Sequence, residues 1–267
     1  MTRFRTLEAS DPALAPEGFD FLTVKSPALR RRADLTLFTP RQGRGQQGLP
    51  LIVLLHGVYG SHWAWAFKGG AHRTLQALVD SGAVPPVVLA MPSDGLWGDG
   101  SGYVPHMDAD FERWIVEEVP AAARQQRPEL DATARPAVIG LSMGGFAALR
   151  LAARYPHRWC AAAAHSCVTE ASELDALTEE SRDGSSTAAD ATSVPGAVDS
   201  ALRKGMRLPP LYLDCGLDDP LLSANRALHE ALCVRGVAHH WREHAGGHDW
   251  PYWQVHLADS LAFICAA

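Results

Sequence analysis

Short apolar runs alternate with helix-like stretches from residue 50 to the end of the chain, and this rhythm limits the possible folds more than any other feature. The run Leu51–Leu55 is apolar at every position, which is typical of a strand covered on both faces. Strands that alternate with helices in this way form a mostly parallel sheet with right-handed crossovers. We therefore predict an α/β fold with a mostly parallel central sheet and helices on both of its faces.

Further strands and helices complete the predicted alternation. We expect strands at residues 87–90, 136–140, 160–165, 211–215 and 238–242. We expect helices at residues 72–81, 110–127, 143–155, 221–234 and 252–265. Asp108 or Asp110 would cap the second of these helices, and Pro120 would kink it because proline lacks the N–H that continues the hydrogen-bond ladder.

Two stretches depart from this rhythm. Residues 19–25 and 33–38 alternate polar and apolar side chains, which predicts an antiparallel strand pair at the N-terminal edge of the sheet, followed by a loop at residues 41–48. Residues 170–205 are rich in Ala, Ser, Thr and Asp, and we expect them to form a loop excursion over the sheet or a lid. No repeat or linker divides the chain, so we predict a single domain over residues 1–267.

Charge and composition narrow the classes of partner. A net charge of −6 and an isoelectric point near 6.0 disfavour nucleic acid and anionic membranes. No apolar run approaches the roughly 20 residues that span a bilayer, and residues 1–8 lead into no apolar core of a signal peptide, so we expect a cytoplasmic protein. The five cysteines have no metal-binding spacing and lie mostly in apolar runs, which predicts reduced, mostly buried thiols. Whether the chain forms a homo-oligomer is left open.

The pentapeptide Gly140-Leu-Ser142-Met-Gly144 follows a predicted strand and opens a predicted helix, which is the context of a nucleophile elbow. Glycines on either side of the serine remove the Cβ atoms that would clash in so sharp a turn. The N-terminus of the helix directs its free N–H groups toward negative charge that develops there. The pattern predicts Ser142 as a nucleophile; the alternative is a tight turn whose serine only caps the helix.

A serine nucleophile needs a histidine base and a carboxylate that orients the base. In folds with such an elbow, the acid and then the histidine follow the serine, each after a later strand. Asp218 and Asp219 follow the predicted strand 211–215, and His248 follows the predicted strand 238–242. The order of these groups therefore predicts His248 as the base, with either aspartate as its partner.

The turn after Leu51–Leu55 supplies the remaining part of such a site. In these folds one backbone N–H from this turn and the N–H of the residue after the nucleophile bind the oxyanion. Here those donors would be Val58 and Met143. We expect His56, at the end of the strand, to brace the turn rather than to act as a second base.

These motifs, taken together, resemble the putative-esterase (esterase D-like) family of the α/β-hydrolase superfamily. The resemblance runs in matching order from Leu49 to the C-terminal end and rests on Leu54-Leu-His56-Gly with Trp65, Met91-Pro-Ser-Asp94-Gly, Gly140-Leu-Ser142-Met-Gly-Gly, Cys215-Gly-Leu-Asp-Asp219 and Gly246-Gly-His248-Asp-Trp250. It implies the α/β-hydrolase fold, a serine carboxylesterase with a Ser-His-Asp catalytic triad and an acyl-enzyme intermediate, and no cofactor. The Gly-x-x-Asp pattern of the family selects Asp219 over Asp218, and Asp214 is the third choice.

The substrate expected from the resemblance is a small-molecule ester. The sequence has no long apolar cap, which favours small soluble esters with short-chain acyl or aryl groups. Tyr59, Trp97 and Trp250 lie in the motif loops and are candidate substrate-binding residues, although such rings also pack loops onto a sheet. The alternatives are a thioesterase of the S-formylglutathione hydrolase type, which the turn His56-Gly-Val-Tyr-Gly60 disfavours, and a non-catalytic binding protein with a hydrolase fold.

His239, His240, His244 and His248 repeat at spacings of four residues, which would form a metal-binding face on a helix. The predicted strand and the pair Gly246-Gly247 exclude a helix there. We therefore expect no metal site in this segment.

Overall fold

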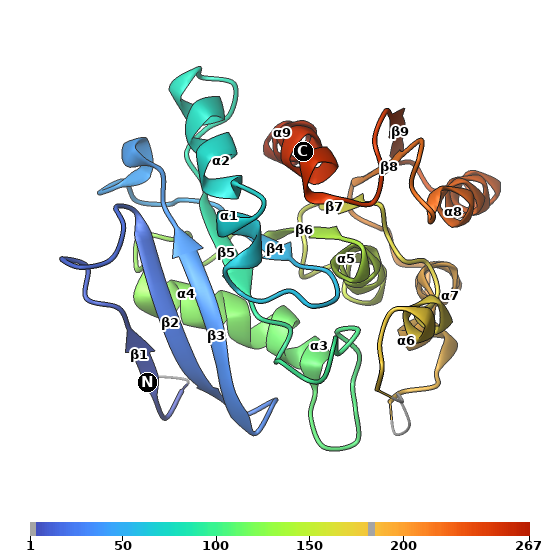
Figure 1. Ribbon diagram of the computed structural model, residues 1–267, viewed down its shortest axis with the longest axis horizontal. Coiled ribbons are helices and arrows are strands. Elements are labelled where there is room, and N and C mark those ends of the chain that lie inside the picture. The colour runs from blue at the N-terminus through green and yellow to red at the C-terminus, as the bar shows by residue number, and fades with distance from the viewer. Residues whose placement is uncertain (1–3, 181–184) are drawn as a thin grey trace.

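A computed structural model describes residues 4–180 and 185–267. The strands form a twisted sheet in the order β1-β2-β3-β5-β4-β6-β7-β8-β9 (Figure 1). Their bounds are Leu7–Ala9 (β1), Phe19–Ser26 (β2), Arg31–Phe38 (β3), Leu51–Leu55 (β4), Val88–Pro92 (β5), Ala137–Leu141 (β6), Ala162–His165 (β7), Leu211–Gly216 (β8) and His240–His244 (β9). The strands β4 to β9 run parallel, and β1 to β3 form an antiparallel edge. The predicted sheet is confirmed, with β1 as an unpredicted addition.

Helices cover both faces of this sheet, as predicted (Figure 1). One face carries α1 (Ala64–Phe67), α2 (Ala71–Asp80) and α9 (Trp250–Ala266). The other face carries α4 (Val119–Gln126), α5 (Met143–Arg154), α7 (Val194–Arg203) and α8 (Leu222–Val234), with the short helices α3 (Phe111–Arg113) and α6 (Ala189–Thr192) nearby. Because side chains alternate along a strand, Ile52 and Leu54 of β4 pack in one core and Val53 and Leu55 in the other.

The predicted helix at residues 110–127 is divided by a π-helical turn over Trp114–Glu118. Asp110 caps its start by accepting a hydrogen bond from the Arg113 N–H at 2.8 Å. Pro120 stands in the first turn of α4, directly after the π-helical turn. The wider turn suits this position because proline has no N–H to donate back along the helix.

Residues 170–205 are more regular than the sequence predicted. They contain a 3₁₀ turn over Ala171–Ala176 and the helices α6 and α7, while residues 181–184 lie outside the described part of the chain. The helix α7 buries an apolar stripe made of Val194, Ala197, Val198 and Ala201. This stripe has helical spacing, a signal of a helix that the prediction of a loop did not take into account, and in the structure α7 packs beside α5. The role of the segment as a lid stays a prediction.

Two chain-wide expectations concern membranes and cysteines. Within residues 4–180 and 185–267, no helix combines the length and the apolar character needed to cross a bilayer. The expectation for the start of the chain falls partly on residues 1–3, which lie outside the described residues. All five cysteines are free thiols, but only Cys167 and Cys215 are buried; Cys160 and Cys265 are half-buried, and Cys233 is exposed.

Candidate active site

Ser142 occupies the sharp turn between β6 and α5. Its backbone angles are φ 52° and ψ −120°, a conformation that residues with a side chain rarely adopt. The Ser142 N–H donates to the His165 carbonyl at 3.0 Å, and the Ser142 carbonyl accepts from the Phe146 N–H at 3.0 Å. A strained residue held by its surroundings in this way points to a functional role.

The glycines around Ser142 permit this turn because there is no room for a Cβ atom. A Cβ on Gly140 would lie 2.0 Å from the Gly144 carbonyl oxygen. A Cβ on Gly144 would lie 2.2 Å from the Leu55 carbonyl oxygen. Since the obstacles are backbone atoms, any side chain at these positions would displace α5 from the sheet.

Three loops at the carboxyl ends of β6, β8 and β9 bring Ser142, Asp219 and His248 together. The Nε2 atom of His248 lies 3.0 Å from the Ser142 Oγ, and its Nδ1 atom lies 2.9 Å from Oδ2 of Asp219. A carboxylate only accepts hydrogen bonds, so Nδ1 carries the proton and Nε2 presents its lone pair to the serine. Asp218 instead donates its backbone N–H to the Gly246 carbonyl and ties the two loops together.

The surroundings of Asp219 favour its charged form. Asp219 is nearly buried; burial opposes its ionisation, but hydrogen bonds, led by that from His248, outweigh burial and keep its pKa below the usual value. Trp253 packs edge-on against the His248 ring at a centroid distance of 5.0 Å. Ser142 is only 3% exposed, whereas the His248 side chain is 24% exposed. Access to the serine is therefore narrow.

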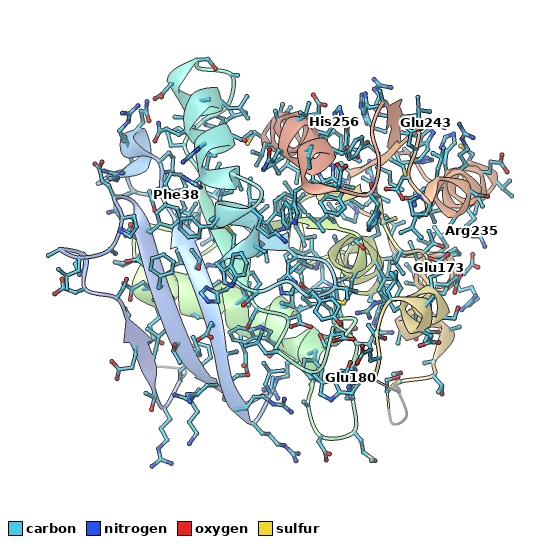
Figure 2. The ribbon with its side chains drawn as sticks, in the orientation of Figure 1. Phe38, Glu173, Glu180, Arg235, Glu243 and His256 are labelled. Atoms are coloured by element: carbon cyan, nitrogen blue, oxygen red, sulfur yellow. The ribbon has the colours of Figure 1, made fainter. Side chains whose placement is uncertain are left out.

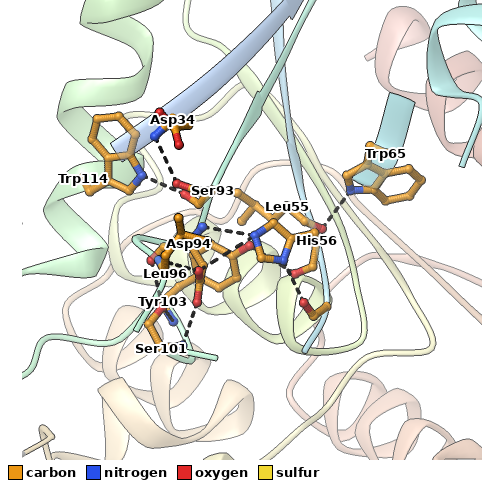
Figure 3. Close-up of polar contacts among 11 residues, drawn as sticks. Asp34, Leu55, His56, Trp65, Ser93, Asp94, Leu96, Ser101, Tyr103 and Trp114 are labelled. Carbon is orange, nitrogen blue, oxygen red and sulfur yellow. Dashed lines mark hydrogen bonds and ion pairs between the residues drawn. The ribbon is translucent and has the colours of Figure 1, made fainter. Parts of the chain in front are cut away.

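The turn after β4 is braced by His56, as predicted (Figure 3). The Nδ1–H of His56 donates to the Gly57 carbonyl at 2.7 Å, and Nε2 accepts from the Asp94 N–H at 3.1 Å. The Tyr103 hydroxyl donates to the His56 carbonyl at 3.1 Å. Burial lowers the pKa of His56, so the ring is neutral and suited to this pair of bonds.

Val58 and Met143, the predicted oxyanion donors, lie beside the serine. A Cβ on Gly57 would stand 3.6 Å from the Ser142 Oγ. A Cβ on Gly100 would lie 2.6 Å from the Met143 Sδ and 3.7 Å from the Val58 Cγ2. The β4 turn, the start of α5 and the loop around Gly100 thus enclose the space next to the serine.

With this geometry in hand, comparison with known proteins assigns the family. A family model described as "Putative esterase" matches residues 26–264. The chain belongs to this family. It is a serine carboxylesterase with an α/β-hydrolase fold, as the sequence predicted.

Relatives of this esterase include an acetyl esterase of Caldicellulosiruptor saccharolyticus, which is 25% identical over 82% of the chain and 84% of its own length. The iron(III) enterobactin esterase of Escherichia coli is 26% identical over 89% of the chain, which spans 54% of that protein. Among solved structures, the fluorophosphonate-binding serine hydrolase FphF of Staphylococcus aureus superimposes with a TM-score of 0.79 at 21% identity and covers 94% of this chain and 99% of its own. This last similarity supports the fold.

Asp94 organises the loop after β5, which forms the rim of the site next to His56 (Figure 3). This role was not predicted from the sequence. The Asp94 carboxylate accepts hydrogen bonds from the Leu96 N–H at 2.9 Å and the Ser101 N–H at 2.7 Å. The Trp114 indole N–H donates to the Ser93 carbonyl at 2.9 Å. The motif Met-Pro-Ser-Asp-Gly had contributed only to the family resemblance, although an aspartate that organises backbone N–H groups is typical of turns.

The three aromatic candidates for substrate binding lie in different settings. Tyr59 is 71% exposed, and a hydrogen bond with Asp99 raises the pKa of its hydroxyl. Trp97 packs edge-on against His106 at 4.6 Å. Trp250 packs edge-on against Trp65 of α1 at 5.8 Å and is half-buried. Substrate contact stays a prediction for all three aromatic residues.

The segment that follows β7 reaches this rim. The Asp99 N–H donates to Oε2 of Glu180 at 2.9 Å, and the Glu179 N–H donates to Oδ2 of Asp99 at 2.7 Å. Figure 2 shows Glu180 beside the loop that precedes α3. Since Tyr59 also donates its N–H to the Asp99 carbonyl at 2.9 Å, Asp99 connects the β4 turn with the segment at residues 170–205.

A second serine, histidine and aspartate lie fully buried behind the site. Nδ1 of His165 lies 2.8 Å from Oδ2 of Asp214, and Nε2 lies 2.9 Å from the Ser260 Oγ. The Tyr252 hydroxyl donates to Oδ1 of Asp214 at 3.0 Å. We call Ser260, His165 and Asp214 the buried line. Its one sequence signal was an aspartate inside an apolar strand, and its partners from β7 and α9 had none.

Proposed function

We propose that this esterase cleaves carboxylic esters by two-step acyl transfer, with Ser142 as nucleophile, His248 as general base and Asp219 as the orienting acid. The observation that carries this proposal is the continuous line of hydrogen bonds from Asp219 through His248 to the Ser142 Oγ, at 2.9 and 3.0 Å. Hydrogen-bond reach between nucleophile, base and orienting group is what such chemistry requires.

In the first step His248 takes the proton from Ser142 while the Oγ bonds to the ester carbonyl carbon. The tetrahedral intermediate collapses, the bond to the alcohol oxygen breaks, and the alcohol leaves with the proton from His248. Water then attacks the acyl-enzyme by the same route, which releases the acid and restores the serine. Asp219 holds the tautomer of His248 and stabilises its cation during both steps.

The N–H groups of Val58 and Met143 bind the oxyanion in this mechanism. Their closeness to the serine supports the assignment, as does the position of Met143 at the N-terminus of α5. The loss of one such donor raises the barrier of related reactions by about 3 kcal/mol.

We propose small esters with short-chain acyl or aryl groups as the substrates. The small exposed fraction of Ser142 and the close packing around Gly100 and Met143 leave little room beside the nucleophile. The name of the relative described as an acetyl esterase agrees with a short acyl group. Tyr59, Trp97 and Trp250 remain the candidates for contact with the rest of the ester.

The test compares hydrolysis of p-nitrophenyl esters of increasing acyl length by the wild type, Ser142→Ala and the matched control Ser260→Ala. We expect kcat/KM to be highest for the shortest acyl groups and to fall about 10⁴-fold or more in Ser142→Ala. A fluorophosphonate probe should label the wild type and Ser260→Ala but not Ser142→Ala. Retained activity and labelling in Ser142→Ala would refute the assignment, and a preference for long acyl chains would refute the substrate class.

A further inference from the structure

Three metal-binding side chains meet on α8 and β9, far along the chain from Ser142. His229 and Cys233 are four residues apart on α8, so they lie on the same face of the helix. His239 stands directly before β9. One ligand atom from each of these residues lies within 4.8 Å of the others, and Cys233 is exposed while both histidines are half-buried.

The orientation of His239 prepares one ring nitrogen for a metal ion. Its Nδ1–H donates to the Val237 carbonyl at 2.8 Å, so Nε2 carries a lone pair and faces Nδ1 of His229 at 2.7 Å. Histidine ligands of metals commonly use their second ring nitrogen in this way, which fixes the tautomer and the ring. The ring of His229 is held in turn by stacking on Trp241 at 5.4 Å.

The spacing of the ligand atoms fits a tetrahedral ion after small side-chain movements. The Cys233 Sγ lies 3.8 Å from Nδ1 of His229. Bond lengths of about 2.0 Å to nitrogen and 2.3 Å to sulfur place ligand atoms about 3.4 to 3.5 Å apart in a zinc site. The observed separations, 2.7 Å between the two histidine nitrogens and 3.8 Å between the Cys233 Sγ and His229, differ from these values by about 1 Å or less. The third pair, Cys233 and His239, has ligand atoms within 4.8 Å of each other. All of these atoms stand at the ends of flexible side chains.

We propose that His229, Cys233 and His239 bind Zn²⁺, with the fourth coordination position open to solvent. Two imidazoles and one thiolate suit a borderline-soft ion of this kind. Binding releases the proton of the Cys233 thiol, while the proton of His229 moves from Nδ1 to Nε2 so that Nδ1 binds the ion as a neutral ligand. No metal site was predicted from the sequence, because the cysteines have no metal-binding spacing among themselves and the regularly spaced histidines lie in one segment, whereas two of these ligands come from α8.

The ion would cross-link the two elements that carry the proposed acid and base. Asp219 lies in the loop that leads into α8, three residues before its start, and His248 lies four residues after the end of β9. Arg226 of α8 already forms a bidentate ion pair with Glu243 of β9 at 2.9 and 2.6 Å. A zinc ion at the far end of α8 would add a second connection, so its effect is on stability rather than on the chemical step.

A second group, His244, His256 and Asp259, offers a matched control. Its two rings stack at a centroid distance of 4.0 Å and an angle of 13°, and Nδ1 of His256 is already 3.2 Å from Asp259. Lone pairs lie in the plane of an imidazole, so stacked rings do not direct them to a common point. We therefore expect this group to bind no zinc.

The experiment uses the reduced, metal-free full chain without an affinity tag. Co²⁺ is titrated as a spectroscopic probe, and Zn²⁺ is titrated against a chromophoric chelator. We expect one Zn²⁺ per chain, a thiolate-to-Co²⁺ charge-transfer band, and a melting temperature that rises by about 5 °C when zinc is present at 100 times its dissociation constant. Cys233→Ser should abolish the band, and both Cys233→Ser and His239→Gln should weaken zinc binding about 100-fold.

The control variants Cys265→Ser and His256→Gln should bind zinc like the wild type. Circular dichroism of each metal-free variant verifies that it is folded. A dissociation constant weaker than about 10 μM in the wild type would overturn the proposal. So would zinc binding that survives Cys233→Ser and His239→Gln, or that is lost only in His256→Gln. Since no readout is ester hydrolysis, these outcomes are independent of the proposed function.

Discussion

Two lines of serine, histidine and aspartate run through this esterase: the buried line and the outer line formed by Ser142, His248 and Asp219. Their connectivity and distances are nearly the same, with 3.0 and 2.9 Å in the outer line and 2.9 and 2.8 Å in the buried line. Both histidines offer one ring nitrogen to a carboxylate and the other to a serine hydroxyl. Residue types and distances alone therefore do not distinguish a catalytic Ser-His-Asp line from a structural one.

The difference lies in the serine proton and in what surrounds it. The Ser260 Oγ also lies 3.0 Å from the Leu257 carbonyl oxygen and donates to it, so the serine proton is used within α9 and is not offered to His165. Ser260 lies inside α9, where the helix already uses the neighbouring N–H groups. Ser142 stands instead at a helix N-terminus, with the lone pair of His248 facing it. The outer line therefore differs from the buried line in two features: a serine proton that the histidine can accept, and free N–H groups at a helix N-terminus beside the serine.

The largest contrast is expected from removing the charge of each aspartate. Asp219→Asn should lower kcat/KM on p-nitrophenyl acetate about 10⁴-fold because His248 then presents the wrong tautomer to Ser142. Asp214→Asn should lower the free energy of unfolding by about 1 to 3 kcal/mol, because an amide has one acceptor oxygen and leaves either His165 or Tyr252 without a buried acceptor. Initial rates and urea denaturation measure the two effects on both variants.

The folded fraction of Asp214→Asn should retain kcat/KM within a few-fold of the wild type, which urea titration and activity at low temperature can verify. The distinction between the two lines would break if Asp214→Asn lost activity as severely as Asp219→Asn while remaining folded. It would equally break if Asp219→Asn kept nearly full activity.

The pH dependence of stability offers a smaller contrast. Hydrogen bonds from His248 and its neighbours keep the pKa of Asp219 below its usual value, although burial acts in the opposite direction. A depressed pKa stabilises the folded state above the unfolded pKa of about 3.9, and this contribution is lost as the pH falls toward the folded pKa. The stability advantage of the wild type over Asp219→Asn should therefore shrink below about pH 4. Urea titrations from pH 6 to pH 3 measure it, and an advantage that stays constant over this range would contradict the pKa direction.

The fold was predictable from sequence wherever burial is complete. The strand at Leu51–Leu55 was predicted to the residue because both of its faces are covered, so every side chain is apolar. β9 begins two residues later than predicted, at His240, because it is a partly exposed edge strand with little apolar pattern to mark its ends. The π-helical turn at Trp114–Glu118 was not predicted, although Pro120 marked where the helical hydrogen-bond pattern changes.

In the candidate site, motifs and the order of residues along the chain identified the proposed nucleophile, acid and base. Contacts between residues far apart in the sequence could not be predicted in this way. The strand, turn and helix context around Ser142 and the order of Asp219 and His248 follow from chain order alone. The pairing of Asp214 with His165 joins residues 49 positions apart and has no sequence motif. The exposure of Cys233 had no sequence signal either, because a helix shows its accessible face only once its packing is known.

The smallest contrast concerns the two tryptophans that follow His248. Trp253→Phe should lower kcat/KM about 2- to 10-fold, because the edge-on contact at 5.0 Å holds the His248 ring and such a pair contributes about 0.5 to 1.5 kcal/mol. Trp250→Phe should change kcat/KM less if its ring serves mainly to pack against Trp65. Kinetics on acetate and benzoate p-nitrophenyl esters separate the two roles, since a loosened base lowers kcat on both. A larger loss in Trp250→Phe, seen mainly in KM and on the aryl ester, would instead make Trp250 the substrate contact that the sequence predicted.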